Sequence, residues 1–344
     1  MESGRATIPS GRVTSRARRR TLVTGGTGFT GSHLVRSLLA DGYDVRVVSR
    51  KRERAIAALG NGVDVIEGDL ADPEVAARAV AGCGTVYHLA AAFREPGIKP
   101  RRYREVHVDA TKYLLEAAKA EGVERIVHCS TIGVHGHVTN PPADELSPFA
   151  PGDIYQETKA DGERLALQLQ REYALPLTVV RPTGIYGPGD LRLLKLFRPI
   201  ARRRFVMVGS GEVFFHMVHV RDLVQGLRLV ATSDAAIGET FIIGGEEYCT
   251  VRELVTRIAR VWGVAAPSLR VPAWPLYAAG ALCEAVTIPF GIDPPLYRRR
   301  VAFFTRSRAF RIDKAKRLLG YRPAVPLQAG LAETAEWYRA GGYV

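Results

Sequence analysis

Tyr155 and Lys159 have the residue types and the spacing needed for proton transfer. They stand four residues apart, so a helix beginning near Asp153 would point both side chains into one cleft. A free phenol has a pKa of about 10 and is a weak base at neutral pH. A neighbouring ammonium group favours the phenolate and lowers that pKa. The pair therefore indicates an acid/base site, although the same spacing also occurs on ordinary helix surfaces.

A glycine motif earlier in the chain has the form of a phosphate-binding turn. The sequence TGGTGFTG, residues 24–31, follows a short apolar run and leads into an apolar helical pattern over residues 29–39. In a strand–turn–helix unit, Gly25 takes the positive φ of a tight turn, Gly28 lets the backbone approach a pyrophosphate, and Gly31 lets the helix pack on the strand. The start of the helix presents free N–H groups to the phosphates. The motif predicts a dinucleotide site, with a glycine turn that binds no ligand as the alternative.

The elements around these motifs alternate between short apolar runs and helical patterns as far as about Pro182. This alternation predicts an α/β fold, a Rossmann-type doubly wound parallel sheet with helices on both faces. Ligands of such sheets lie beyond the carboxyl ends of the strands, where both motifs fall. The expected strands are 21–23, 45–48, 63–66, 85–89, 125–129 and 177–180. The expected parts are a basic disordered arm (1–19), a dinucleotide-binding domain (20–188) and a smaller C-terminal substrate-binding region (189–344) interleaved with the sheet.

The glycine spacing G-x-x-G-x-x-G and a series of further motifs resemble the extended short-chain dehydrogenase/reductase (NAD-dependent epimerase/dehydratase) family. The resemblance covers nearly everything from Arg20 to the C-terminus. Within the family, the chain most resembles the 3β-hydroxysteroid/sterol dehydrogenase and dihydroflavonol reductase-like branch. The matching segments are Gly68-Asp69-Leu70, His88-Leu89-Ala90-Ala91, Ser130 to Gly136, Tyr155 with Lys159, Val180 to Pro188, Val220 to Leu223, Asp313 to Tyr321 and Trp337-Tyr338.

The resemblance implies roles for individual residues. Tyr155 is the acid/base, Lys159 also holds the nicotinamide ribose, and Thr131 hydrogen-bonds the substrate oxygen, with Ser130 as the competing candidate. Asp69 contacts the adenine amine, and no metal is expected. The residues expected to bind the cofactor are Gly25, Thr27, Gly28, Phe29, Thr30, Gly31, Arg50, Lys51, Asp69, Leu70, Leu89, Ala90, Ala91, His107, Tyr155, Lys159, Pro182 and Thr183.

Three departures from the family pattern narrow the chemistry. His107 stands where many members have Asn; it either supports the ribose and proton network or fills space. Gly184 replaces the Asn that binds the substrate pyrophosphate in nucleotide-sugar enzymes, which argues against a nucleotide-sugar substrate. Ile132 and Gly133 replace the Asp-Glu pair of sugar 4,6-dehydratases, and neither transfers a proton, so elimination by that route is not expected.

The end of the second strand bears on the type of cofactor. An acidic residue there accepts hydrogen bonds from the adenosine ribose and repels a 2′-phosphate. This chain instead has Ser49, Arg50, Lys51 and Arg52. Guanidinium and ammonium groups suit a 2′-phosphate, so we favour NADP(H). NAD(H) remains possible if these side chains point to solvent.

The net charge of +13 is concentrated partly in residues 1–20, which hold six arginines and one glutamate. This arm lacks the apolar centre of a secretory signal; a transit peptide is the alternative interpretation. The clusters 101–102, 202–204 and 298–300 are interpreted as solvated faces, or as contacts to an anionic substrate or a membrane surface. No nucleic-acid-binding module is recognisable. The four cysteines form neither a metal-ligand spacing nor a dense disulfide pattern, which favours a cytoplasmic location.

These observations predict an NAD(P)-dependent oxidoreductase that interconverts a secondary alcohol and a ketone on a bulky, largely apolar, steroid-like small molecule. A nucleotide-sugar epimerase with the same Tyr and cofactor is the alternative, and a non-catalytic dinucleotide sensor is a third hypothesis. We expect a homodimer. Residues 271–283 carry no charge and are too few to span a bilayer. They either line the substrate pocket, form a buried helix, or contribute to a peripheral membrane contact over residues 271–292.

Overall fold

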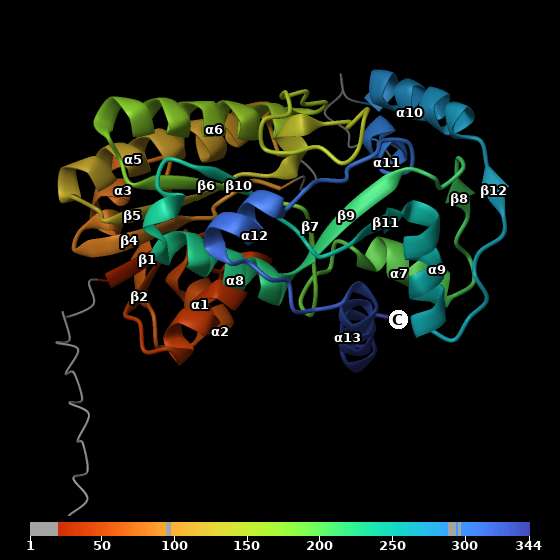
Figure 1. Ribbon diagram of the computed structural model, residues 1–344, viewed down its shortest axis with the longest axis horizontal. Helices are drawn as coiled ribbons and strands as arrows, with labels where there is room; N and C mark the ends of the chain where they lie inside the picture. The colour runs from red at the N-terminus through yellow and green to blue at the C-terminus, as the bar shows by residue number, and fades with distance from the viewer. Residues whose placement is uncertain (1–19, 94–97, 288–293, 295–296) are drawn as a thin grey trace, which may run out of the picture.

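The main sheet of the protein has seven strands, all parallel, in the order β10-β6-β5-β4-β1-β2-β3. The computed structural model describes residues 20–93, 98–287, 294 and 297–344, so the predicted arm, 1–19, lies outside it. The predicted doubly wound Rossmann-type sheet is confirmed (Figure 1). Its strands are β1 (Arg20–Thr24), β2 (Val45–Ser49), β3 (Asp64–Glu67), β4 (Cys83–His88), β5 (Arg125–Cys129), β6 (Leu177–Pro182) and β10 (Thr240–Ile243).

Two helical layers enclose this sheet, which explains why its strands are apolar on both faces (Figure 1). One layer is α1 (Phe29–Ala40), α2 (Arg52–Leu59) and α8 (Val220–Thr232), and the other is α3 (Pro73–Val80), α5 (Ala110–Glu121) and α6 (Ile154–Tyr173). Each layer has its own apolar core: Leu34 and Leu38 of α1 are buried on one side, and Leu114 and Leu115 of α5 on the other.

The chain after β6 builds a second group of elements and also returns to the main sheet. The small sheet of β7 (Gly184–Tyr186), β9 (Phe214–His219) and β11 (Tyr248–Thr250) packs with helices around a third apolar core. β10 leaves this group and pairs with β6, so the C-terminal region contributes a strand to the dinucleotide-binding sheet. The remaining elements are α4 (Pro100–Arg104), α7 (Leu194–Ala201), β8 (Met207–Val208), α9 (Val251–Val261), β12 (Arg270–Val271), α10 (Ala273–Thr287), α11 (Arg298–Ala302), α12 (Asp313–Leu319), α13 (Leu327–Ala340) and the short helices η1 (Glu105–Asp109), η2 (Ile132–His135) and η3 (Asp234–Ala236).

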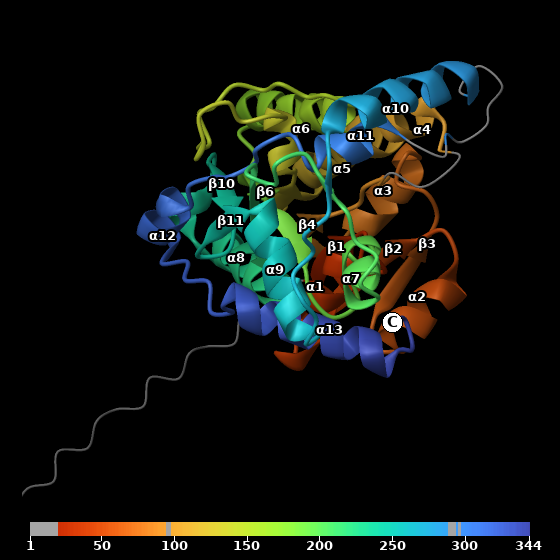
Figure 2. The ribbon, with the colours of Figure 1, turned by 90° about the vertical axis from the view of Figure 1, so that its right-hand side faces the viewer.

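Helix α10 contains the uncharged segment and lies on the outside of the molecule, packed on α11 (Figure 2). Trp274 is 72% exposed, Leu282 66% and Val286 55%, while Gly280 is the helix's buried residue. The buried-helix interpretation of this segment is therefore wrong. Among the residues that the structure describes, no helix is long and apolar enough to cross a membrane. Residues 288–292 lie outside the described part of the chain.

Candidate active site

The glycine turn between β1 and α1 packs so tightly that it leaves no room for a side chain at Gly25 or Gly31. Gly25 has a φ of +68°, and a Cβ there would lie 2.9 Å from the backbone of Ala90. A Cβ on Gly31 would lie 2.2 Å from the carbonyl oxygen of Gly25. Gly28 begins α1 without a side-chain cap, so the first N–H groups of the helix are left for a ligand. This turn fits the phosphates of a dinucleotide. Thr27, Phe29 and Thr30 are half-buried around it.

The predicted acid/base pair lies on α6, which Asp153 starts by accepting a hydrogen bond from the N–H of Gln156 at 3.0 Å. Tyr155 is half-buried, and Lys159 is 4% exposed. The Nζ of Lys159 donates to the carbonyl oxygen of Cys129, at the end of β5, over 2.7 Å. Burial lowers the pKa of Lys159. The sheet thus fixes the lysine in place, one helical turn from the tyrosine.

Thr131 and Ser130 face different surroundings at the end of β5. Thr131 is half-buried, and its hydroxyl oxygen accepts the N–H of Gly133 at 3.0 Å. A Cβ on Gly133 would lie 3.4 Å from Cγ of Gln156, the neighbour of Tyr155. Ser130 is buried and donates to the carboxylate of Glu163 at 2.5 Å, behind the strand end. The Thr131 hydroxyl therefore lies in the segment next to Tyr155, whereas that of Ser130 is taken up by a structural contact.

The Glu163 carboxylate that accepts the Ser130 hydroxyl is also part of a buried ion pair. Glu163 is 0% exposed and Arg181 is 4% exposed. The Arg181 Nε lies 2.9 Å from Glu163 Oε1, and its Nη2 lies 2.5 Å from the same oxygen. Arg181 also donates to the carbonyl of Glu145 at 2.8 Å and contacts the ring of His135 at 3.1 Å. The pair joins α6, β6 and the loop that follows Thr131.

His107 links the segment after β4 to α6, the helix that carries Tyr155 and Lys159. Its Nε2 accepts the N–H of Ala92 at 3.0 Å, so Nδ1 carries the proton and donates to the Thr158 hydroxyl at 2.8 Å. Burial beside Lys159 lowers the pKa of His107 to about 2, so the ring is neutral. Its plane meets the ring of Tyr155 edge-on, with centroids 5.5 Å apart. His107 therefore does not merely fill space, because its hydrogen bonds join the segment after β4 to α6. Its contact to the cofactor stays a prediction.

The residues predicted around the adenosine lie at the ends of β2 and β3. Arg50 and Lys51 are exposed, and neither forms an ion pair with any other described residue. Asp69 accepts the N–H of Ala71 at 3.0 Å, and its other oxygen lies 2.5 Å from the Arg102 guanidinium of α4. Arg102 belongs to the cluster 101–102, which was expected to be a solvated face or a contact to an anionic substrate or a membrane. Its pairing with Asp69, 33 positions earlier, has no local signal in the sequence. The adenine contact of Asp69 remains a prediction.

The remaining predicted cofactor residues line the ends of β3, β4 and β6. Leu70 and Thr183 are buried, Leu89 and Ala90 are half-buried, and Ala91 is exposed. The Thr183 hydroxyl is buried without a hydrogen-bond partner in the described structure. Pro182 ends β6 and is buried. All of these positions belong to the carboxyl-terminal edge of the sheet, as predicted.

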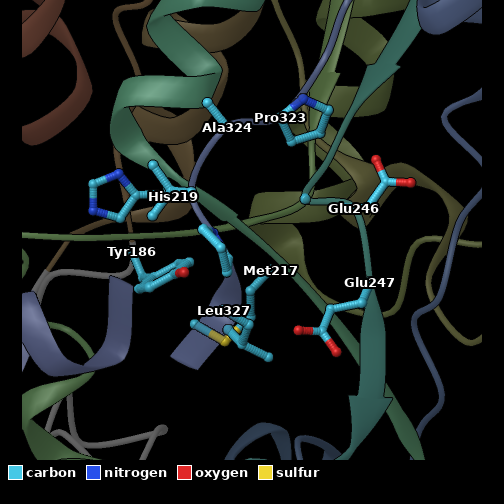
Figure 3. Close-up of a pocket in the computed structure, with 11 residues that line it drawn as sticks. Tyr186, Met217, His219, Glu246, Glu247, Pro323, Ala324 and Leu327 are labelled. Atoms are coloured by element: carbon cyan, nitrogen blue, oxygen red, sulfur yellow. The ribbon is translucent and has the colours of Figure 1, made fainter. Parts of the chain in front are cut away.

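A cavity of about 240 Å³ lies in the C-terminal region and involves none of the predicted site residues. Tyr186, Met217 and Leu327 surround it, with Glu246 and Glu247 at one side (Figure 3). Both carboxylates are already paired, Glu246 with Lys316 and Glu247 with Arg257. No group of three or more metal-ligating side chains is found in residues 20–93, 98–287, 294 and 297–344.

The fold and the glycine turn define a dinucleotide-dependent enzyme. The chain belongs to the NAD dependent epimerase/dehydratase family, whose model matches residues 21–244. It is 30% identical to sterol demethylase protein B of Methylococcus capsulatus, covering 94% of this chain and 99% of that protein. It is 31% identical to a 3-beta-hydroxysteroid dehydrogenase of Mycolicibacterium neoaurum, covering 93% of this chain and 91% of the other.

Solved structures give the same result for the fold. MoeE5, whose structure contains UDP-glucuronic acid and NAD, matches with a TM-score of 0.72 and 28% identity over 94% of this chain and 99% of the other. The predicted family, fold and enzyme class are confirmed: the chain is an NAD-dependent enzyme of the extended short-chain dehydrogenase/reductase family. The glycine turn described above fits this cofactor.

Proposed function

We propose that this enzyme interconverts a secondary alcohol and a ketone on a bulky, largely apolar substrate. The observation that carries the proposal is at Gly184, the first residue after Thr183. A Cβ at Gly184 would lie 2.9 Å from Cζ of Phe215, so this aromatic ring occupies the space beside the glycine. An Asn side chain for a substrate pyrophosphate does not fit there without displacing the ring.

The ring of Phe215 belongs to a group of aromatic side chains in the C-terminal region. Its centroid lies 5.0 Å from that of Phe303, which lies 4.9 Å from that of Phe304. All three side chains are half-buried, so part of each remains open to a ligand. Half-buried aromatic surface is typical of sites that bind apolar molecules. The hydroxysteroid and sterol names of the relatives agree with such a substrate.

In the proposed reaction, Thr131 holds the substrate oxygen and Tyr155 exchanges a proton with it. The nicotinamide cofactor supplies or accepts the hydride. Lys159, fixed by the Cys129 carbonyl, holds the nicotinamide ribose and favours the phenolate of Tyr155 electrostatically. The hydrogen bonds of His107 to Ala92 and Thr158 hold α6 against the segment that follows β4.

A substrate assay separates this function from that of an epimerase, which the family's description makes the main alternative. We expect the enzyme to consume NADPH when it is given steroid-like or other bulky ketones. The loss of NADPH absorbance measures this consumption. UDP-glucose should give neither reduction nor epimerised sugar on chromatography. Epimerised sugar with no net consumption of cofactor would make the epimerase correct. Tight cofactor binding with no turnover on either panel would favour a dinucleotide sensor.

We further propose a preference for NADP(H), because Arg50 and Lys51 are exposed and unpaired among the described residues at the end of β2. Arg50→Ser should weaken NADPH binding about ten- to a hundredfold and NADH binding little, as expected for a lost charge-assisted phosphate contact. Arg54→Ser, on the exposed surface of α2, is the matched control. If Arg50→Ser weakens the binding of NADPH and NADH equally, or if the wild type prefers NADH, the proposed preference for NADP(H) is wrong.

The exposed side chains of α10 support a peripheral membrane contact as a secondary proposal. Trp274, Leu282 and Val286 give this helix an apolar outer surface. Flotation with anionic phosphatidylserine vesicles should recover the wild type, and Trp274→Ser with Leu282→Ser should stay at the bottom of the gradient. Equal recovery of both proteins contradicts the contact. We also propose that the protein is a homodimer. Size-exclusion chromatography with light scattering measures its mass in solution and tests this.

A further inference from the structure

The loop between β7 and α7 reaches across to the glycine turn, although the two are far apart in sequence. The carbonyl oxygen of Pro188 lies 3.0 Å from Nε2 of His33 on α1. A Cβ at Gly189 would lie 3.4 Å from the ring of Phe29, the first residue of α1. The C-terminal region therefore covers the end of α1 where the phosphates of a dinucleotide are expected.

Arg192, in this loop, places its guanidinium group between the two segments that flank the expected cofactor. Its Cζ lies 5.3 Å from the ring centroid of Phe29 and 5.4 Å from that of Phe93. Both distances are within the range of a cation–π contact. Phe93 follows β4, and its ring meets that of Tyr155 edge-on at 5.1 Å. The guanidinium group thus bridges the start of α1 and the segment beside the catalytic tyrosine.

Hydrogen bonds to a buried aspartate and to a backbone carbonyl fix the orientation of this arginine. Its Nε and its own backbone N–H both donate to Oδ1 of Asp190, at 2.7 and 2.9 Å, and its Nη2 donates to the Ile185 carbonyl at 3.0 Å. Asp190 is 1% exposed, and its carbonyl accepts the Tyr338 hydroxyl at 2.5 Å. Nη1 of Arg192 has no acceptor among the described residues, and the side chain is 40% exposed. A preoriented arginine loses little entropy when an anion binds.

We propose that Arg192 is a further dinucleotide-binding residue, which contacts the pyrophosphate from the side opposite the glycine turn. The helix start offers N–H groups to one side of the phosphates, and the guanidinium group offers a planar cation to the other. The C-terminal region thereby contributes to cofactor affinity as well as to substrate binding. The proposal rests on the proposed function only in requiring a dinucleotide and is independent of which ketone is reduced.

Binding measurements without substrate test the proposal separately from the reaction. Arg192→Gln should raise the Kd for NADPH, NADH and ADP-ribose alike, about ten- to a hundredfold, in fluorescence titrations and calorimetry. Arg192→Lys should lie between Arg192→Gln and the wild type, because lysine keeps the charge but not the planar donors. Arg198→Gln is the matched control, since Arg198 is an exposed arginine of α7 that donates to the Tyr343 carbonyl.

Two outcomes overturn the proposal. One is an unchanged Kd for all three ligands with a lower melting temperature, which makes Arg192 only a structural link between the regions. The other is an unchanged Kd for the ligands with a raised KM for ketones, which makes its partner an anionic substrate. If ketone turnover is absent in the wild type but the Kd values shift as stated, the proposed function fails and the Arg192 contact stands.

Discussion

Removing one partner of the Glu163–Arg181 ion pair should destabilise the protein far more than removing both. Arg181→Met leaves the Glu163 carboxylate, which is 0% exposed, with the Ser130 hydroxyl as its remaining described hydrogen-bond partner. Three N···O contacts of 2.5 to 3.2 Å disappear in this variant. An unpaired buried charge costs about 3–5 kcal/mol, so we expect a loss of that size in the free energy of unfolding. The double variant Glu163→Leu/Arg181→Met has no unpaired charge and should recover more than half of the loss.

Urea denaturation followed by fluorescence, with far-UV circular dichroism as a second probe, measures these free energies. The matched control is the surface pair of Arg257 and Glu247, with N···O distances of 2.9 Å. Arg257→Met should cost less than about 1 kcal/mol, because water replaces the lost partner. If Arg181→Met costs no more than Arg257→Met, or if the double variant loses the sum of its single changes, the charge argument is refuted.

Three further predictions concern the site. Tyr155→Phe should lower kcat by about 10²-fold or more with little change in the Kd for NADPH, and near-normal turnover would count against the proton-transfer role. Gly31→Ala should weaken dinucleotide binding and lower the melting temperature, because its Cβ would lie 2.2 Å from the Gly25 oxygen; an unchanged protein would disprove the close packing. Burial lowers the pKa of His88 to about 3 and of His107 to about 2, so both stay neutral in the folded protein. Below about pH 6.5 both histidines are protonated in the unfolded chain but not in the folded protein. Each should therefore lower the free energy of unfolding by about 1.4 kcal/mol per pH unit, down to about pH 4. Urea titrations that give the same free energy of unfolding at pH 6.5 and pH 5 would contradict this.

The sheet could be predicted from sequence because each of its first six strands has a local apolar pattern. The expected strand over 125–129 coincides with β5, and the strand expected over 63–66 is observed one residue later, as Asp64–Glu67. β10 was not assigned to this sheet. Its four residues pair with β6 through contacts across a long intervening segment, which local periodicity does not encode.

The candidate site likewise has features that local sequence predicts and contacts that it does not predict. The glycine turn and the Tyr155–Lys159 spacing are local patterns, and the structure places them at one edge of the sheet. The Ser130 contact to Glu163 and the Arg192 contact to Phe29 join residues that are distant in sequence. An arginine in a polar loop looks like a solvated charge until the packing of the loop is known.

The position of β10 has a consequence for how the chain is made. The N–H of Val179 in β6 is paired with the carbonyl of Glu239, and the N–H of Thr183 with that of Ile243. During synthesis, β6 leaves the ribosome well before its partner strand and exposes an unpaired edge in the meantime. A messenger truncated after residue 188 would encode the glycine turn and the Tyr–Lys pair without the strand that completes the sheet. We expect such a fragment to be a substrate for chaperones and proteases rather than a miniature nucleotide-binding protein.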